Sequence, residues 1–359
     1  MKIEASRRLE HFQTGIFAAL NEKKEELLAS GKKIYNLSVG TPDFPVFDHI
    51  RKALVEAAQD PEKYHYTLRD LPELHEAVKD YYKKRFDVEI STDEIVAVPG
   101  SQEGVAHLGL TLCNPGDVVL LPNPGYPVFE VGAYLGGAEL YFYELREEND
   151  FLPKFDEIPE DIARRAKYIM VSYPYNPVCA VAPASFYEEL IAYAKKYNII
   201  VVHDNAYSDI IYDGVRGGSF LEFPGAKEVG IECFSLSKSF NLTGARVSFM
   251  IGNREIIDAV KLLRSQYDFG IFEPIQRAAI AALEGPLEPV RAQCVRYQER
   301  RDALCGGLRS IGWDVRDSQG TMFAWARIPE GFSYAQQFVM ELMDKTGVIC
   351  TPGDAFGSM

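Results

Sequence analysis

Short apolar runs alternate with helical segments through the middle of the chain, between Glu94 and Ile251. The runs are apolar on both faces and are bounded by glycine, proline and asparagine turns. Strands of this kind, separated by helices, form a largely parallel sheet with helices on both faces. The strands predicted in this way cover residues 95–98, 118–121, 138–143, 168–171, 199–202, 233–236 and 247–251.

Polar and aromatic residues follow several of these strands, and the carboxyl ends of parallel strands meet at one ligand-binding edge. Gly100-Ser101-Gln102 lies where a strand turns into a helix, so its N–H groups and the helix dipole favour a phosphate. An ordinary serine N-cap is the simpler alternative. Tyr126, held between two prolines, can lay a flat ring on a ligand, or can be half-buried at a domain edge.

Two further strand ends carry candidate ring-binding groups. Asn176 can donate to a ring oxygen, although an Asn-Pro pair also forms ordinary turns. Asp204 ends a strongly apolar strand, where a carboxylate is costly to bury unless it is paired. A protonated ring nitrogen would pair it, and a helix N-cap is the alternative role. Ala206 leaves room for a planar ring, and Tyr207 can reach the same oxygen as Asn176.

The segment from Ser235 to Arg246 combines an amine with phosphate-binding groups. Lys238 can form a Schiff base with an aldehyde cofactor. The hydroxyls of Ser235 and Ser237 and the guanidinium of Arg246 can make charge-assisted hydrogen bonds to a phosphate dianion. With the strand-end residues, these groups match the phosphate, ring nitrogen, ring oxygen and aldehyde of pyridoxal phosphate.

These motifs resemble the fold-type-I pyridoxal-phosphate enzymes of the aspartate aminotransferase superfamily, and within it the class I/II aminotransferases. The resemblance runs from Gly40-Thr41-Pro42-Asp43-Phe44-Pro45 to Thr351-Pro352-Gly353-Asp354-Ala355-Phe356-Gly357. Residues 100–104 and 203–208 make the chain most similar to LL-diaminopimelate aminotransferase-like proteins. The resemblance implies an α/β fold in which a large domain with a mostly parallel sheet is joined to a smaller αβ domain.

The implied function is transfer of an amino group between an amino acid and a 2-oxo acid, such as LL-diaminopimelate or another acidic amino acid with 2-oxoglutarate. By resemblance, Lys238 holds the cofactor covalently and acts as general base, Asp204 binds the pyridine nitrogen, and Tyr126 stacks on the ring. The phosphate is expected to be held by Ser101, Gln102, Ser235, Ser237 and Arg246. The phenolate oxygen is expected to be held by Asn176 and Tyr207, and the substrate carboxylate by Asn176 and Gly40.

The resemblance also implies a homodimer with shared active sites, in which a tyrosine reaches the partner's phosphate. Tyr64 and Tyr66 flank the matching position, which His65 occupies, and Tyr66 is favoured. The chain departs from the family in two places. The usual Asn-Pro-Thr-Gly reads Asn-Pro-Val-Cys at residues 176–179, and the chain stops before the arginine that binds the substrate α-carboxylate in relatives.

The expected organisation is an N-terminal arm, residues 1–45, that packs with the small domain; a large pyridoxal-phosphate-binding domain, residues 46–253; and a small domain with its connecting helix, residues 254–359. The small domain is expected to be truncated at its C-terminus. The helices predicted by periodicity cover residues 17–29, 49–58, 74–86, 102–112, 185–197, 254–267, 274–283, 288–311 and 335–344, with a strand at 321–326.

Two enzymatic and two non-enzymatic alternatives stay open. A β-eliminating C–S lyase uses the same cofactor, and the core motifs do not exclude it. Ser235-Leu236-Ser237-Lys238 with Lys345-Thr346-Gly347 matches two elements of serine acyl-transfer enzymes, but the S-D-N element is absent. A cofactor-sensing regulator would need a DNA-binding module, for which no motif is present. A truncated, inactive binding form is the remaining non-enzymatic interpretation.

Composition limits the other classes. The formal net charge of −14 opposes nucleic-acid binding, which requires a basic surface. No apolar run approaches the roughly 20 residues of a membrane span, and no signal peptide is recognisable, so a cytoplasmic protein is expected. The six cysteines are far apart and no metal-ligand spacing occurs, so free thiols and no metal site are expected.

Overall fold

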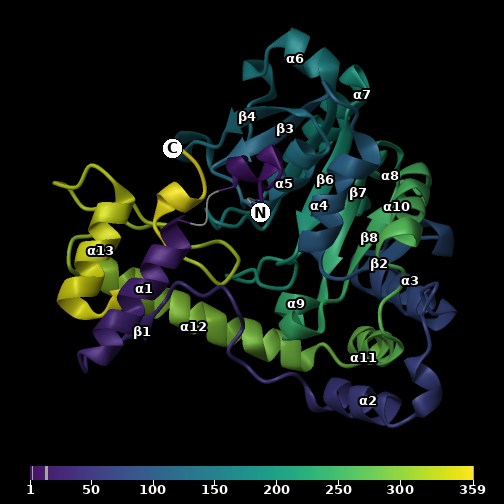
Figure 1. Cartoon of the computed structure of the whole chain (residues 1–359), viewed down its shortest axis with the longest axis horizontal. Coiled ribbons are helices and arrows are strands. Elements are labelled where there is room, and N and C mark those ends of the chain that lie inside the picture. The colour runs from purple at the N-terminus through teal and green to yellow at the C-terminus, as the bar shows by residue number, and fades with distance from the viewer. Residues whose placement is uncertain (2, 13–14, 359) are drawn as a thin grey trace. The chain divides into compact units, whose positions relative to one another are not determined.

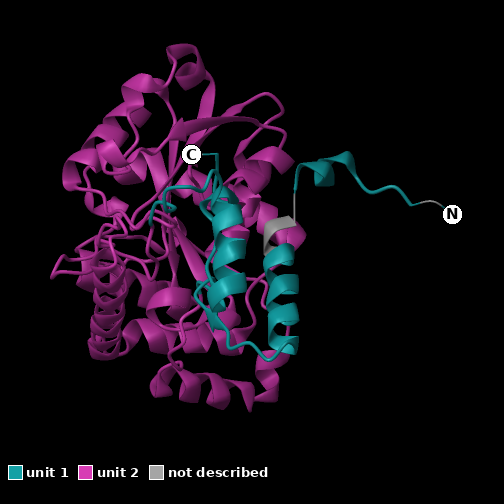
Figure 2. Ribbon diagram, turned by 90° about the vertical axis from the view of Figure 1, so that its left-hand side faces the viewer, with its two compact units in different colours: residues 1–40, 326–359 teal, residues 41–325 magenta. Residues whose placement is uncertain are grey.

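The computed structural model describes residues 1, 3–12 and 15–358, with the side chains of residues 15–17 left out. The chain forms two compact units (Figure 2), the smaller made of residues 1–40 and 326–359 and the larger of residues 41–325. The predicted domain boundaries, at residues 45 and 253, differ from these units because they assign residues 254–325 to the small domain. The predicted domain organisation stays a prediction.

The larger unit contains a seven-stranded sheet in the order β2-β8-β7-β6-β5-β3-β4 (Figure 1). Only β8 runs against its neighbours β2 and β7, and the other pairs are parallel. The predicted, largely parallel sheet is therefore confirmed. The strands are β2 Ile95–Val98, β3 Val118–Asn123, β4 Glu139–Glu144, β5 Ala166–Ser172, β6 Ile200–Asn205, β7 Gly230–Ser235 and β8 Ser248–Gly252.

Alternate residues of each strand enter two separate cores, as the two-residue period of a strand requires. Val96, Val119 and Val202 pack with α4, α5 and α10 on one face, whereas Ala97 and Val201 pack with α3 and α7 on the other. Both faces are thus covered. The helices of this unit are α2 Asp48–Ala58, α3 Pro72–Phe86, α4 Ser101–Leu112, α5 Val128–Leu135, α6 Glu160–Arg165, α7 Ala184–Tyr197, α8 Ala226–Val229, α9 Leu236–Ser239, α10 Arg254–Tyr267, α11 Glu273–Glu284 and α12 Glu288–Ser310.

Local signals explain where several helices begin. The side chain of Asn253 accepts hydrogen bonds from the N–H groups of Glu255 and Ile256 at the start of α10. Helices α3, α11 and α12 each carry a proline in their first turn, where no intrahelical N–H bond is lost.

The smaller unit pairs the two ends of the chain. Strand β1, Tyr35–Asn36, runs parallel to β9, Val348–Ile349. Helices α1, Gly15–Ala29, and α13, Ala335–Thr346, pack their apolar side chains together beside this pair. The N-terminal segment therefore packs with the C-terminal part of the chain.

One predicted strand does not form. Residues 321–326 adopt no regular strand, because Thr321 takes a left-handed φ of 68° and its N–H bonds the carbonyl of Ile210. The six cysteines are free thiols, as predicted. Throughout the described segments, no helix combines the length and apolar character that a membrane span needs.

Candidate active site

Lys238 lies just beyond the carboxyl end of β7, on the short helix α9. Ser235 caps this helix, because its Oγ accepts the N–H of Ser237 at 3.2 Å. Ser235 Oγ also accepts the hydroxyl of Ser248 at 2.9 Å, so its own proton remains available to a ligand. The cap thereby fixes the direction in which Lys238 leaves the sheet.

The Lys238 amine is partly buried among charged and aromatic groups. Burial lowers its pKa to about 8; the positive charge of Arg246 acts in the same direction and Asp204 opposes both. Its Nζ lies 5.9 Å from the centre of the Tyr207 ring. A lysine with this pKa is neutral in a sizeable fraction of molecules near neutral pH, and a neutral amine is a nucleophile and a base.

Asp204 lies near the end of β6 with one carboxylate oxygen shielded from solvent. That atom, Oδ1, has no hydrogen-bond partner among the described residues. Burial raises the pKa of Asp204 to about 6, with His203 and then Lys238 opposing the shift. A buried, unpartnered carboxylate oxygen is costly, and a protonated ring nitrogen is the kind of group that would satisfy it.

Two tyrosines lie close to Asp204. Burial raises the pKa values of Tyr126 and Tyr207, and for both the carboxylate of Asp204 is the second cause. The Tyr126 hydroxyl donates to Gln102 at 3.3 Å, which joins the loop after β3 to the first turn of α4. Asn176 is half-buried in the loop after β5. The structure thus brings Tyr126 and Tyr207 near Asp204 and Lys238, and the roles expected of these residues stay predictions.

A cradle of donors forms where β2 turns into α4. Gly100 has φ of 93°, and a Cβ built on it would come within 2.3 Å of Nη2 of Arg246. The guanidinium therefore packs directly against the turn before α4, in space that a side chain at position 100 would fill. The first-turn N–H groups at Ser101 and Gln102 face no helical acceptor and carry the positive end of the helix dipole. This combination suits a dianionic group.

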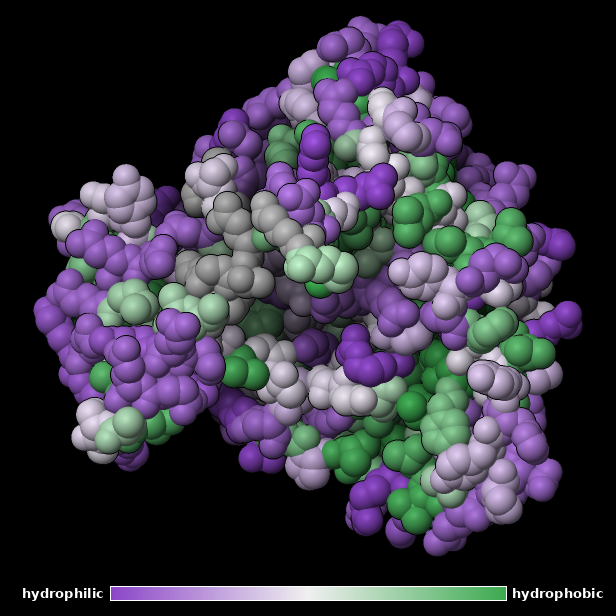
Figure 3. Space-filling view, viewed as in Figure 1, coloured by the Kyte–Doolittle hydropathy of each residue, from purple (hydrophilic) through white to green (hydrophobic). Residues whose placement is uncertain are grey.

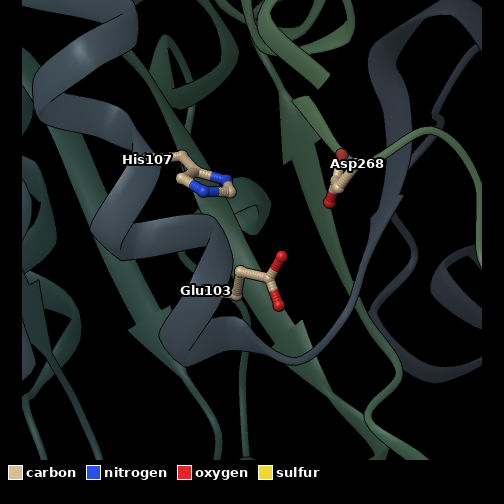
Figure 4. Close-up of side chains that lie close together, drawn as sticks. All are labelled: Glu103, His107 and Asp268. Carbon is tan, nitrogen blue, oxygen red and sulfur yellow. The ribbon is translucent and has the colours of Figure 1, made fainter. Parts of the chain in front are cut away.

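A cluster of three titratable side chains, two of them on α4, lies close to this turn (Figure 4). Ligand atoms of Glu103, His107 and Asp268 all lie within 4.8 Å of one another. Asp268 is already paired with Arg264, whose Nε lies 3.0 Å from one of its oxygens. Burial and the neighbouring Asp268 raise the pKa of Glu103. Since one carboxylate is neutralised by arginine and the other favours protonation, we assign no metal to this group.

Tyr66 lies on the surface of the single chain, and Gly40 belongs to the smaller unit. Tyr66 is 88% exposed and its ring lies 6.3 Å from that of Phe269. Gly40 is the last residue of the smaller unit, and its contact with substrate stays a prediction.

The sequence interpretation missed a buried polar network behind β6. His203 and Glu232 are fully buried, and His203 Nδ1 lies 3.1 Å from Glu232 Oε2. Each residue interrupts an apolar strand, so the sequence did contain a signal. Their pairing could not be read, because it depends on the register of β6 against β7, which places His203 opposite Glu232.

The chain is similar to known proteins over nearly its whole length. The chain is 42% identical over 358 residues to an LL-diaminopimelate aminotransferase of Dehalococcoides mccartyi, covering 99% of this chain and 92% of that protein. Among solved structures, substrate-bound BacF from Bacillus subtilis superimposes with a TM-score of 0.94 at 38% identity, covering 100% of this chain and 91% of that one.

A probable N-succinyldiaminopimelate aminotransferase from Thermus thermophilus superimposes with a TM-score of 0.90 at 35% identity, covering 96% of this chain and 92% of that one. Residues 32–358 match the family described as aminotransferase class I and II. The chain belongs to the class I and II aminotransferase family.

Proposed function

We propose that this aminotransferase uses pyridoxal phosphate, held covalently by Lys238, to move an amino group between an amino acid and a 2-oxo acid. The observation that carries the proposal is the meeting of an amine with a lowered pKa, a buried carboxylate with an unpartnered oxygen, and an arginine at a helix N-terminus. When bound, pyridoxal phosphate supplies an aldehyde that bonds amines and a ring that withdraws electrons from the substrate Cα.

The donors around Gly100 would hold the phosphate. Arg246 offers a guanidinium, and the first turn of α4, including Ser101 and Gln102, offers backbone N–H groups. Ser235 retains a hydroxyl proton to donate, and Ser237 lies two residues further along.

The ring would be held by three kinds of contact. The unpartnered Oδ1 of Asp204 would accept the ring nitrogen proton, and an ionised Asp204 would keep that nitrogen protonated. Tyr126 would cover one ring face, and Tyr207 and Asn176 would donate to the phenolate oxygen. These assignments follow the placement of Tyr126 and Tyr207 around Asp204.

Lys238 would also move the proton. Once a substrate amine has displaced it, its Nζ could take the proton from the substrate Cα and deliver it to the former aldehyde carbon of the cofactor, on the other side of the substrate nitrogen. Burial favours this role, because an amine whose pKa is about 8 both accepts and releases a proton near neutral pH. Tyr126 and Asp204 would hold the reacting plane fixed while Lys238 acts.

For the substrate we propose LL-diaminopimelate or another acidic amino acid, with 2-oxoglutarate as the acceptor. The support is the 42% identity to an LL-diaminopimelate aminotransferase over nearly the whole chain. Asn176 and the backbone near Gly40 are the proposed contacts for the substrate carboxylate. A cytoplasmic location stays a prediction.

A homodimer with shared sites is the proposed assembly. Exposed apolar side chains gather between residues 64–68 and 267–272, with the ring of Tyr64 5.2 Å from that of Phe272. On the face drawn in Figure 3, apolar atoms collect at the lower right, over the region labelled α2 and α11 in Figure 1. Large exposed patches usually mark contact surfaces, and Tyr66, which is 88% exposed, belongs to the segment 64–68.

The test is direct. Purified protein loaded with pyridoxal phosphate should form glutamate from LL-diaminopimelate and 2-oxoglutarate, and a Lys238→Ala variant should not. Release of ammonia and pyruvate from a sulfur amino acid without any acceptor acid would instead identify a C–S lyase. Borohydride reduction followed by peptide mapping should mark Lys238, and a mark on another lysine would overturn the assignment.

A further inference from the structure

Glu232 is a charged residue with no access to solvent on β7, the strand next to β6, which carries Asp204. Its Oε1 accepts the hydroxyls of Tyr82 at 2.7 Å and Ser219 at 2.8 Å. Its Oε2 accepts the N–H of Phe220 at 2.8 Å and lies 3.1 Å from Nδ1 of His203. Helix α3, the 3-10 turn Phe220–Glu222, β6 and β7 thus meet at one carboxyl group.

These contacts favour the ionised form of Glu232. The Ser219 oxygen already accepts the N–H of Leu221, so its hydroxyl proton points to Glu232. A backbone N–H can only donate, and so both carboxyl oxygens receive hydrogen bonds. Burial would raise the pKa of Glu232, but the hydrogen bond and charge of His203, followed by the hydrogen bonds of Tyr82 and Ser219, hold it below its usual value.

A buried carboxylate requires a positive partner, since an isolated charge costs several kcal/mol to bury. His203 faces Glu232 through Nδ1 and lies 3.3 Å from the Tyr187 hydroxyl through Nε2. The Phe220 ring covers it at 5.9 Å, and Asp204 follows it on its own strand. An imidazolium would donate from both nitrogens, to the Glu232 carboxylate and to the Tyr187 oxygen, and would leave no net buried charge.

We propose that His203 and Glu232 form a buried imidazolium–carboxylate pair, in which His203 is a positioning residue that favours the ionised form of Asp204. The proposal deepens the proposed function and rests on it, because an ionised Asp204 is what a protonated ring nitrogen needs.

The link to Asp204 runs through the sheet itself. His203 shares the face of Val201, packed against α7, whereas Asp204 shares the opposite face with Val202. A charge on His203 therefore acts on Asp204 from behind, through low-dielectric protein that screens little. Among the charges that oppose the burial of Asp204, that of His203 is the largest, ahead of Lys238.

His203→Asn tests the charge in the working enzyme. Asparagine keeps a donor for Glu232 but carries no charge, so Asp204 should ionise at higher pH. The acid limb of kcat/KM is expected to move up by about half to one pH unit. Tyr82→Phe is the matched control, because it removes one hydrogen bond to Glu232 and no charge. It should lower the melting temperature while leaving the acid limb in place.

A second measurement needs neither cofactor nor turnover. In ¹⁵N-histidine-labelled apo-protein, the ring of His203 can be assigned by substituting the other five histidines one at a time. Two protonated ring nitrogens with similar shifts are the expected result. One protonated and one bare nitrogen would overturn the proposal, even where His203→Asn does not fold.

The pH profile and the nitrogen shifts together separate this inference from the proposed function. Failure of the wild-type protein to take up pyridoxal phosphate would refute the proposed function, while the nitrogen shifts would still decide the state of His203. A wild-type enzyme that transaminates normally, together with a His203→Asn variant whose acid limb does not move, would refute the role of His203 alone.

Discussion

Asp204 and Lys238 have pKa values that burial has moved toward each other. The acid is raised to about 6 and the amine is lowered to about 8. In both cases burial is the main cause, so each side chain opposes folding in its charged form. Groups with such shifted pKa values are concentrated at functional sites, where a reactive side chain is retained although it lowers the stability of the fold.

Replacing Asp204 should therefore stabilise the apo-protein. Because its folded-state pKa is raised above the reference of 3.8, ionisation opposes folding as the pH rises from about 4, and the full cost is present above about 6. Asp204→Asn should gain about 1–3 kcal/mol of unfolding free energy at pH 7.5 and almost none at pH 4. Urea unfolding at the two pH values measures this gain.

The same variant should lose about 10²-fold or more in turnover of the loaded enzyme, since the ring nitrogen loses its charged partner. Asp48→Asn, on the exposed surface of α2, is the control and should gain no stability. A loss of apo-protein stability in Asp204→Asn at pH 7.5 would contradict the assigned cost of burial.

Lys238 leads to a prediction about cofactor uptake. Only the neutral amine attacks an aldehyde, so covalent attachment to apo-protein should speed up as pH rises and level off above about 8. Stopped-flow absorbance follows the reaction. Lys238→Arg keeps the positive charge but should show no covalent phase. A rate still rising steeply at pH 10 would mean that the pKa of the Lys238 amine is not lowered.

At the scale of elements, the turn from β2 into α4 joins backbone conformation to ligand binding. Gly100→Ala meets two penalties, a φ of 93° that disfavours side chains and a Cβ within 2.3 Å of Arg246. Gly116 has the same φ of 93° and open space around it. Gly116→Ala should therefore share the backbone penalty, about 1 kcal/mol, without the collision.

We expect Gly100→Ala alone to weaken pyridoxal phosphate binding, by about tenfold or more, because Arg246 is displaced from the cradle. Fluorescence titration of the two apo-variants measures this difference, and urea unfolding checks that both retain a folded core. Equal affinities would show that Arg246 does not hold the phosphate from this position.

Most elements were predictable where a local signal marks their ends. Helix α10 begins after the Asn253 cap, as predicted, and α4 begins at Ser101, one residue before its predicted start. The segment 321–326 was predicted wrongly, because apolar content alone cannot show that Thr321 turns the chain and bonds Ile210. The reversed direction of β8 was also not predicted, since an apolar run does not record its orientation.

Candidate site residues could be named from the sequence in part, and their roles stay predictions. Residues at strand ends could be named individually, because the carboxyl ends of parallel strands share one edge. Contacts that depend on three-dimensional approach could not be read. The packing of Arg246 against Gly100 and the pairing of His203 with Glu232 both need the turn geometry and strand register that the structure supplies.

At the scale of the whole molecule, the larger unit exposes a group of large apolar and aromatic side chains. Tyr66, Leu68 and Tyr267 are exposed by 88%, 68% and 65%, and Phe269 and Phe272 lie beside them in the chain. In the proposed dimer this patch is buried against a second copy, and Tyr66 serves the partner's site.

The final prediction follows from that surface. Phe269→Asp should shift the protein from dimer to monomer in light scattering, since a charge placed in an apolar interface is costly to bury. The substitution suits the chain locally, because Phe269 has a left-handed φ of 58°, a conformation that aspartate tolerates. Val215→Asp, at another exposed apolar position, is the control and should remain a dimer. The monomer should also bind pyridoxal phosphate more weakly, because Tyr66 no longer reaches the phosphate. A monomeric wild-type protein with full cofactor affinity and turnover would show that each chain builds its site alone.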